Sequence, residues 1–292
     1  MEEPTRDIQQ RVAATLRKRP TGWRRVQRGY TPAERWVVTF DDGSKCFVKV
    51  GTTPLTATWL RDEYERVYSR IEAPFLPRLL GWDDDPEQPI LILEDLSEAF
   101  WPPPWTNARV EAVLSTLAAV REAPLGRLTS FADSIGDAVA WTWGMVELDP
   151  APFLSLGLCS VEWLQYALPI LLLATRSMRL DGEAVMHRDV RSDNICFVGD
   201  RAVLVDWPAV CRGNELKDLA FWAPSLHAEG GPPPEAILPD APDLAAFTAG
   251  YFAARAGLPI IPDAPRVREV QYQQLSTALP WAARALNLPP LK

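Results

Sequence analysis

A polar segment followed by two short apolar runs constrains this chain more than any other feature of its sequence. Within residues 187–194, Asp189 and Asn194 lie five positions apart, and Asp206 follows twelve positions after Asn194. The intervening residues predict a strand, a Gly-Asp turn and a second strand: 195–198, 199–200 and 202–205. Such a hairpin would bring Asp189, Asn194 and Asp206 to its open end, so that three polar side chains face one cleft.

These residue types suit the transfer of a phosphoryl group, which needs few reactive groups but accurate placement. One carboxylate must accept the proton of the attacking hydroxyl, and oxygen ligands must hold Mg²⁺ against nucleotide phosphates. We predict Asp189 as the catalytic base, with Asn194 and Asp206 as metal ligands. Arg191 would add positive charge near the transferred group. The alternative is that these Asp and Asn residues are ordinary turn formers beside a hairpin.

At these residues the chain resembles the aminoglycoside phosphotransferase family, the small-molecule branch of the protein-kinase-like superfamily. The tripeptide Val205-Asp206-Trp207 is similar to that branch's aspartate–tryptophan signature. Arg188 stands where the family often has Gly and matches protein kinases instead. The resemblance extends, more weakly, from about Gly29 to Asp218, and the C-terminal third has no matching motif.

The resemblance implies an α+β protein-kinase-like bilobal fold. A small antiparallel β-sheet lobe with one main helix would bind nucleotide (residues 1–95), and a mostly helical lobe would carry catalysis and substrate binding (residues 96–292). It implies ATP, or alternatively GTP, and Mg²⁺ as cofactors. The implied partner is a small hydroxylated molecule.

An N-terminal hairpin supplies the lysine that such a fold requires. In residues 36–40 strand alternation places Trp36, Val38 and Phe40 on one face. Asp41-Asp42-Gly43 is a strong turn signal, and a second strand carries Lys49 among apolar residues. The resemblance implies that Lys49 holds the α- and β-phosphates of the nucleotide. A solvated strand lysine is the alternative, and Lys45 fits that description better.

Glu63 is the predicted partner of Lys49. Thr53-Pro54 is a suitable helix start, and one apolar stripe follows it: Leu60, Tyr64, Val67 and Ile71. Glu63 shares this stripe, and a buried carboxylate needs a partner. Pairing of Glu63 with Arg66 or Arg70 at the boundary is the alternative.

The remaining nucleotide contacts are predicted by position. The sequence lacks Gly-x-Gly-x-x-Gly and Gly-x-x-x-x-Gly-Lys-Ser/Thr, which argues against Rossmann and P-loop proteins. The segment around Gly29 and Thr31 lies where the related fold covers the phosphates. The apolar run 89–96 looks like the strand and hinge that contact the base, so Glu94 and Leu96 are candidate nucleotide contacts.

Composition and net charge limit the kinds of partner that this protein is expected to bind. A net charge of −8 argues against a nucleic-acid partner and is compatible with a cationic acceptor. No apolar run approaches the roughly 20 residues of a membrane span, and the N-terminus lacks a signal peptide, so we expect a cytoplasmic protein without a membrane partner. The four cysteines show no metal-ligand spacing and are expected to be reduced and buried. The oligomeric state is left open.

The C-terminal part should be mainly helical, including a helix from 161 to about 179 that is apolar almost all round and therefore buried. Asp218 would support the catalytic loop or cap a helix. Only eleven residues separate Asp206 from Asp218, too few for a peptide-binding platform.

We therefore predict a kinase for a small alcohol such as an antibiotic, sugar or amino alcohol. The acceptor site would lie between the catalytic loop and the C-terminal helices. Candidate wall residues are Asp193, Trp207, Glu215 and the aromatic segment 141–143, whose tryptophans could instead belong to the core. A non-catalytic nucleotide-binding module is the main alternative, and a protein kinase is the weaker one.

Overall fold

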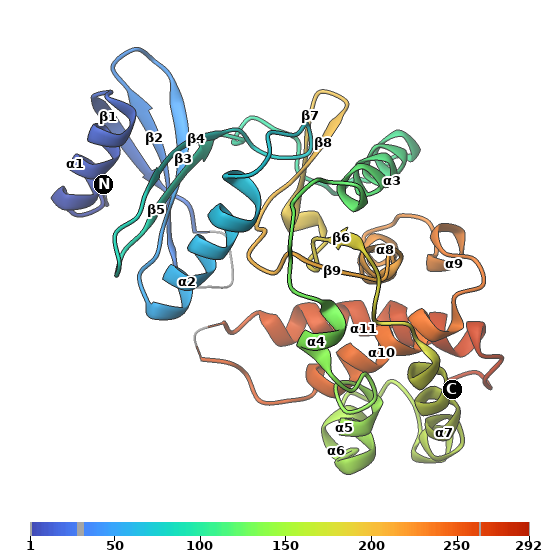
Figure 1. Cartoon of the computed structure of the whole chain (residues 1–292). Helices are drawn as coiled ribbons and strands as arrows, with labels where there is room; N and C mark the ends of the chain where they lie inside the picture. The colour runs from blue at the N-terminus through green and yellow to red at the C-terminus, as the bar shows by residue number, and fades with distance from the viewer. Residues whose placement is uncertain (1, 28–31, 263, 292) are drawn as a thin grey trace. The chain divides into compact units, whose positions relative to one another are not determined.

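The computed structural model describes residues 2–27, 32–262 and 264–291, which form two compact units (Figure 1). The first unit contains residues 1–101, 124–126 and 193–210, and the second contains 102–123, 127–192 and 211–292. The hairpin predicted after Asn194 therefore packs with the N-terminal part of the chain. The functional division at residue 95 stays a prediction.

A five-stranded antiparallel sheet forms the centre of the first unit, in the order β1-β2-β3-β5-β4. Its strands are β1 (Pro20–Arg25), β2 (Glu34–Phe40), β3 (Lys45–Val50), β4 (Leu79–Asp83) and β5 (Ile90–Glu94). The predicted turn joins β2 to β3, and Gly43 adopts the left-handed φ of 79° that the tight turn requires. The predicted antiparallel N-terminal sheet is thus confirmed.

Each face of this sheet is covered by a helix. Helix α1 (Arg6–Leu16) begins at Thr5, whose side chain caps the backbone N–H of Ile8. One core combines Ile8 and Val12 with one face of the sheet: Trp23, Trp36, Val38, Phe40, Cys46, Val48, Val50, Ile90 and Ile92. The sequence prediction of one main helix missed α1, although Ile8, Val12 and Leu16 recur every four residues behind a capping threonine.

Helix α2 (Pro54–Glu63) begins with a capping box between Thr53 and Thr56, as the Thr-Pro start predicts. The helix does not continue regularly to Ile71. A π-helical turn, η1 (Tyr64–Tyr68), follows Glu63 and directs both Val67 and Tyr68 inward. Tyr64 instead stacks on Trp82, with ring centroids 4.4 Å apart. A π-helical turn contains about one residue more than an α-helical turn, so the residues after Glu63 no longer follow the predicted apolar stripe.

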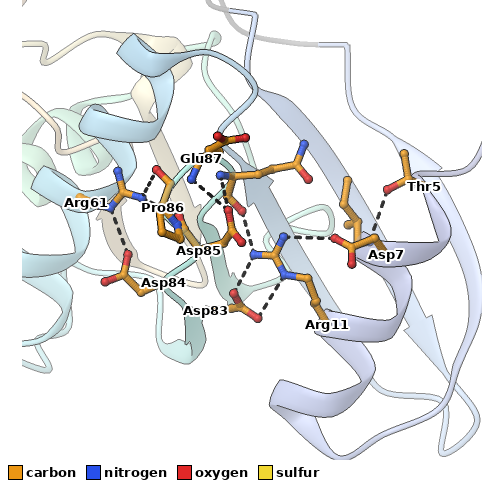
Figure 2. Close-up of polar contacts among 11 residues, drawn as sticks. Thr5, Asp7, Arg11, Arg61, Asp83, Asp84, Asp85, Pro86 and Glu87 are labelled. Carbon is orange, nitrogen blue, oxygen red and sulfur yellow. Dashed lines mark hydrogen bonds and ion pairs between the residues drawn. The ribbon is translucent and has the colours of Figure 1, made fainter.

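The end of β4 and the segment that follows it tie both helices to the sheet (Figure 2). Arg11 of α1 lies 2.6 Å from Asp83, and this hydrogen bond raises the pKa of the guanidinium. Arg61 of α2 donates to the Asp84 carboxylate at 3.0 Å and to the Asp85 carbonyl at 2.5 Å. The contacts of Arg61 hold the last turn of α2, only two residues before Glu63, and therefore help to set the direction of the Glu63 side chain.

The second unit is mostly helical, as predicted, with one two-stranded sheet formed by β6 (Ala184–Met186) and β9 (Cys211–Gly213). Its helices are α3 (Asn107–Arg121), α4 (Phe131–Ile135), α5 (Trp143–Leu148), α6 (Ala151–Leu154), α7 (Val161–Ser177), α8 (Lys217–Ala228), α9 (Pro234–Ile237), α10 (Pro242–Ala256) and α11 (Val267–Ala285). Helix α10 contacts α11, α7 and α8 and supplies much of the core (Figure 1).

The predicted burial of the helix over 161–179 is wrong. Helix α7 packs through Trp163, Ala167 and Leu171, whereas Tyr166 is 59% exposed and Leu173 67% exposed. It lies at the surface of its unit and packs chiefly against α10 and α5, so its apolar composition exceeds what packing requires. Within the described residues, no helix combines the length and apolar character needed to cross a membrane.

Candidate functional site

Lys49 lies on the face of β3 opposite the α1 core, as strand alternation predicts. It is 6% exposed, and its Nζ donates to Glu63 Oε2 at 2.7 Å and to Asp206 Oδ1 at 2.9 Å. The alternative partners of Glu63 are engaged elsewhere, because Arg66 pairs with Asp62 and Arg70 bonds backbone carbonyls. One buried ammonium thus joins a strand, a helix and the hairpin of the first unit.

The charge state of this cluster follows from burial and proximity. Burial alone would lower the pKa of Lys49, but the Asp206 and Glu63 carboxylates outweigh it and raise that pKa. Burial raises the pKa of Glu63 despite the opposing charge of Lys49. Lys49 is therefore held as a cation, which is the form that attracts phosphate oxygens.

Hairpin geometry brings Asn194 and Asp206 together. The strands β7 (Ile195–Val198) and β8 (Arg201–Leu204) pair with Ile195 opposite Leu204. The next pair continues this register, because Val205 N–H donates to the Asn194 carbonyl at 3.0 Å. Asp206 then leaves the ladder with a left-handed φ of 71°. This turn explains why β8 ends one residue before the predicted Val205.

Trp207 fixes the end of this turn. Its backbone N–H donates to Glu63 Oε1 at 3.2 Å, and its indole N–H donates to the Leu204 carbonyl at 2.9 Å. The side chain is fully buried, with its ring centroid 5.9 Å from that of Phe75. Trp207 is therefore a core residue, and its prediction as a wall of the acceptor site is wrong.

The donor atoms of this cluster suit Mg²⁺. Asn194 and Asp206 offer an amide and a carboxylate, and the Asp206 side chain is 40% exposed. In the described part of the chain, no three His, Cys, Asp or Glu side chains gather as a metal site. Mg²⁺ does not need such a cage, because it commonly binds one or two protein carboxylates together with water and phosphate oxygens. A donor set without sulfur or imidazole fits Zn²⁺ poorly.

The segment predicted as the catalytic loop begins in the second unit. His187 follows β6 and is fully buried, and its Nδ1 accepts the Asp189 N–H at 3.2 Å. Arg191 Nε lies 3.1 Å from Asp189 Oδ1, and the Asp189 side chain is 47% exposed. The predicted base, Asp189, is therefore accessible to solvent and forms an ion pair with Arg191. Its functional role, like those of the residues in the first unit, stays a prediction.

Asp218, in the first turn of α8, holds this loop from behind. Its Oδ2 accepts His187 N–H at 2.5 Å, and its Oδ1 accepts Arg188 N–H at 2.9 Å. The sequence left open whether Asp218 supports the loop or caps its helix, and these bonds identify support of the loop. Glu229 adds a second anchor, since it accepts from Ser192 and from the Trp105 indole.

We expect Asp218→Ala to destabilise the protein by about 2–6 kcal/mol, because the N–H groups of His187 and Arg188 lose their acceptor and each such loss costs roughly 1–3 kcal/mol. Thermal unfolding followed by circular dichroism measures this loss. Asp243→Ala, in the first turn of α10 where the side chain is only partly buried, is the matched control and should change stability by less than about 1 kcal/mol. Equal unfolding temperatures for both variants would contradict the assigned role of Asp218.

The other predicted nucleotide contacts are placed as follows. Glu94 ends β5, and its carboxylate accepts the N–H of Arg78 at 3.1 Å. The Leu96 carbonyl accepts the Ala99 N–H and the Trp101 indole N–H. Gly29 and Thr31 lie outside the described residues. The roles of all four as nucleotide contacts stay predictions.

Lys217 is the residue of this region that sequence reasoning missed. It precedes Asp218, is 3% exposed, and lies over the aromatic rings of Phe221 and Phe131. Nothing in the sequence distinguishes it from an ordinary surface lysine, because its burial results from packing between helices α8 and α4. The only local signal is its position next to Asp218.

Comparisons with known proteins identify the fold and go no further. No protein-family model matches the sequence, and no curated protein matches it. Many solved structures do match, although their sequence identities to this chain are low, for example 8% and 21%. Solved structures of several small-molecule phosphotransferases share the fold of this chain, which confirms the predicted bilobal α+β fold.

Three structures illustrate the likeness. An aminoglycoside phosphotransferase from Alicyclobacillus acidocaldarius has a TM-score of 0.58 and 14% identity, covering 98% of this chain and 96% of that one. A spectinomycin phosphotransferase bound to ADP and spectinomycin has a TM-score of 0.58 and 11% identity, covering 99% and 100%. A choline/ethanolamine kinase family protein from Mesorhizobium loti has a TM-score of 0.52 and 16% identity, covering 89% and 92%.

Proposed function

We propose that this chain belongs to the aminoglycoside phosphotransferase family and transfers the γ-phosphoryl group of ATP to a hydroxyl of a small molecule. The observation that carries the proposal is the cluster in which Lys49 bonds Glu63 and Asp206 beside Asn194. A structural ion pair would not require the Asp206 carboxylate to remain 40% exposed at the end of a hairpin. A site that binds a cation and phosphates does require it.

Each side chain has a distinct task in this reaction. Lys49 binds nucleotide phosphate oxygens, and Glu63 orients its ammonium group. Asn194 and Asp206 hold Mg²⁺, which when bound neutralises charge on the phosphates. Asp189 accepts the proton of the attacking hydroxyl, and Arg191 places positive charge beside it. GTP is the alternative nucleotide, because no described side chain distinguishes the two bases.

The short connection after Asp206 supports a small acceptor. Only β9 and the turns around it separate Asp206 from α8, which begins at Lys217. Such a connection offers no extended segment on which a peptide substrate could lie. The structural neighbours named for aminoglycosides, spectinomycin, or choline and ethanolamine support the same class of acceptor.

An acceptor screen tests this proposal. The protein is incubated with ATP, Mg²⁺ and single compounds drawn from aminoglycosides, macrolides, sugars and amino alcohols, and ADP release is measured with a coupled assay. We expect at least one alcohol to stimulate ADP release, and we expect EDTA to abolish the stimulation and excess Mg²⁺ to restore it. Nucleotide binding without stimulation by any alcohol would favour a non-catalytic module. Labelling of protein in a dialysed lysate would favour a protein kinase.

A further inference from the structure

The backbone of Arg188 is held in a conformation that its residue type disfavours. Its φ is 74°, in the left-handed region where a side chain is strained and glycine is not. Asp189 follows immediately, so this backbone conformation sets the direction in which the Asp189 carboxylate leaves the loop. A residue held in such a region persists only where its surroundings impose the conformation.

Two consecutive residues of α8 hold the Arg188 backbone in this conformation, one through its N–H and the other through its carbonyl. Asp218 Oδ1 accepts the Arg188 N–H at 2.9 Å, and Lys217 Nζ donates to the Arg188 carbonyl at 3.4 Å. The Arg188 side chain adds a third contact, because its guanidinium lies 5.0 Å from the centre of the Phe131 ring. The same ring lies 5.3 Å from Lys217 Nζ, so Phe131 fixes the positions of both cations.

Burying the charged ammonium group of Lys217 in this position costs free energy. Burial lowers the pKa of its ammonium, Arg188 adds to the lowering, and the charges of Asp218 and Asp189 oppose it. Among the described residues, no carboxylate oxygen lies within 4.0 Å of Nζ, and its close partners are a carbonyl and two aromatic rings. An apolar residue of similar length would fill the same space without a desolvated charge. A role outside stability would explain the lysine.

We propose that Lys217 is a positioning residue which, together with Asp218, clamps the Arg188 peptide and thereby aims Asp189. The inference rests on the proposed function only in taking Asp189 as the base. The clamp itself is a property of the loop. The clamp implies that the conformation of the loop around Arg188 depends on Lys217 whenever the residue at position 188 is not glycine.

The first experiment compares Lys217→Met with Lys217→Arg in the full chain. Hydrogen exchange measured by mass spectrometry should be about tenfold faster for peptides covering 187–190 in Lys217→Met, because the strained peptide opens more often. Peptides from β2 and β3 provide the internal reference and should not change. Lys217→Arg, which retains a donor, should exchange like the parent. Unchanged exchange in Lys217→Met overturns the clamp, whether or not the protein turns over ATP.

Turnover separates positioning from a structural role. In Lys217→Met we expect kcat for ADP release to fall about tenfold with KM for ATP within twofold, while the unfolding temperature stays equal or rises. A merely structural lysine would lower the unfolding temperature and leave kcat unchanged. If the parent releases no ADP with any acceptor, the proposed function fails while the exchange result still decides the clamp.

A change at position 188 supplies the decisive comparison. Arg188→Ala and Arg188→Gly both remove the guanidinium, but only glycine accepts a φ of 74° without strain. Lys217→Met should therefore accelerate loop exchange about tenfold in the Arg188→Ala protein and no more than about threefold in the Arg188→Gly protein. Equal effects in the two backgrounds would overturn the proposal that Lys217 acts on the backbone of Arg188.

Discussion

Replacing Asp189 with Asn should lower the rate of phosphoryl transfer by about 10²–10⁴-fold, because a positioned general base contributes a factor of that size. Asparagine fills the same space but cannot accept the proton of the acceptor hydroxyl. The Asp189 side chain is 47% exposed and its ion-pair partner is Arg191, so the loss of charge should leave the fold intact. Single-turnover measurement of ADP formation on an acceptor found by the screen gives the rate directly.

Nucleotide binding distinguishes this loss from a general loss of activity. ATP affinity measured by titration calorimetry should stay within about twofold of the parent in Asp189→Asn, since Asp189 is not among the proposed nucleotide contacts. Asp200→Asn makes the same chemical change in the exposed turn between β7 and β8 and should leave both rate and affinity unchanged. Equal rates for the parent and Asp189→Asn would remove Asp189 as the base.

Sequence patterns predicted correctly those structural features that are determined by residues close together along the chain. The β7–β8 hairpin follows from two apolar runs around Gly-Asp, and its register alone brings Asn194 close to Asp206. The direction of Lys49 follows from strand alternation. Its pairing with Glu63 follows from the cost of burying either charge alone.

Features that depend on tertiary packing could not be predicted in the same way. The π-helical turn after Glu63 changes the helix period by one residue, and no residue type signals it. The positive φ of Arg188 runs against its residue type and exists because Lys217 and Asp218 approach from a helix about thirty positions away. The apolar composition of α7 suggested a buried helix, yet α7 lies at the surface of its unit. Composition shows that a helix could be buried, but it does not show whether other elements pack over it.

Lys49→Met is expected to combine the loss of turnover with a loss of stability. Removing one partner of a buried ion pair strands the other charge, which costs roughly 3–5 kcal/mol. Glu63 is 1% exposed and would be left with only the Trp207 N–H as a described donor. At about 2–4 °C per kcal/mol for a domain of 150–250 residues, the unfolding temperature should fall by roughly 6–20 °C. The loss of a phosphate-binding cation should also reduce kcat/KM for ATP by about 10²-fold or more.

Two further variants separate these effects. Lys45→Met makes the same change on the exposed side chain four residues earlier on β3 and should alter neither stability nor kcat/KM appreciably. Lys49→Met combined with Glu63→Met removes both charges, so it should recover part of the lost stability while remaining inactive, because apolar replacement of a buried pair is often tolerated. If the double variant were as active as the parent, the cluster would be a structural ion pair. Loss of activity with recovered stability is the result that a phosphate-binding lysine requires, since a second methionine can relieve a buried charge but cannot supply an ammonium group to the nucleotide.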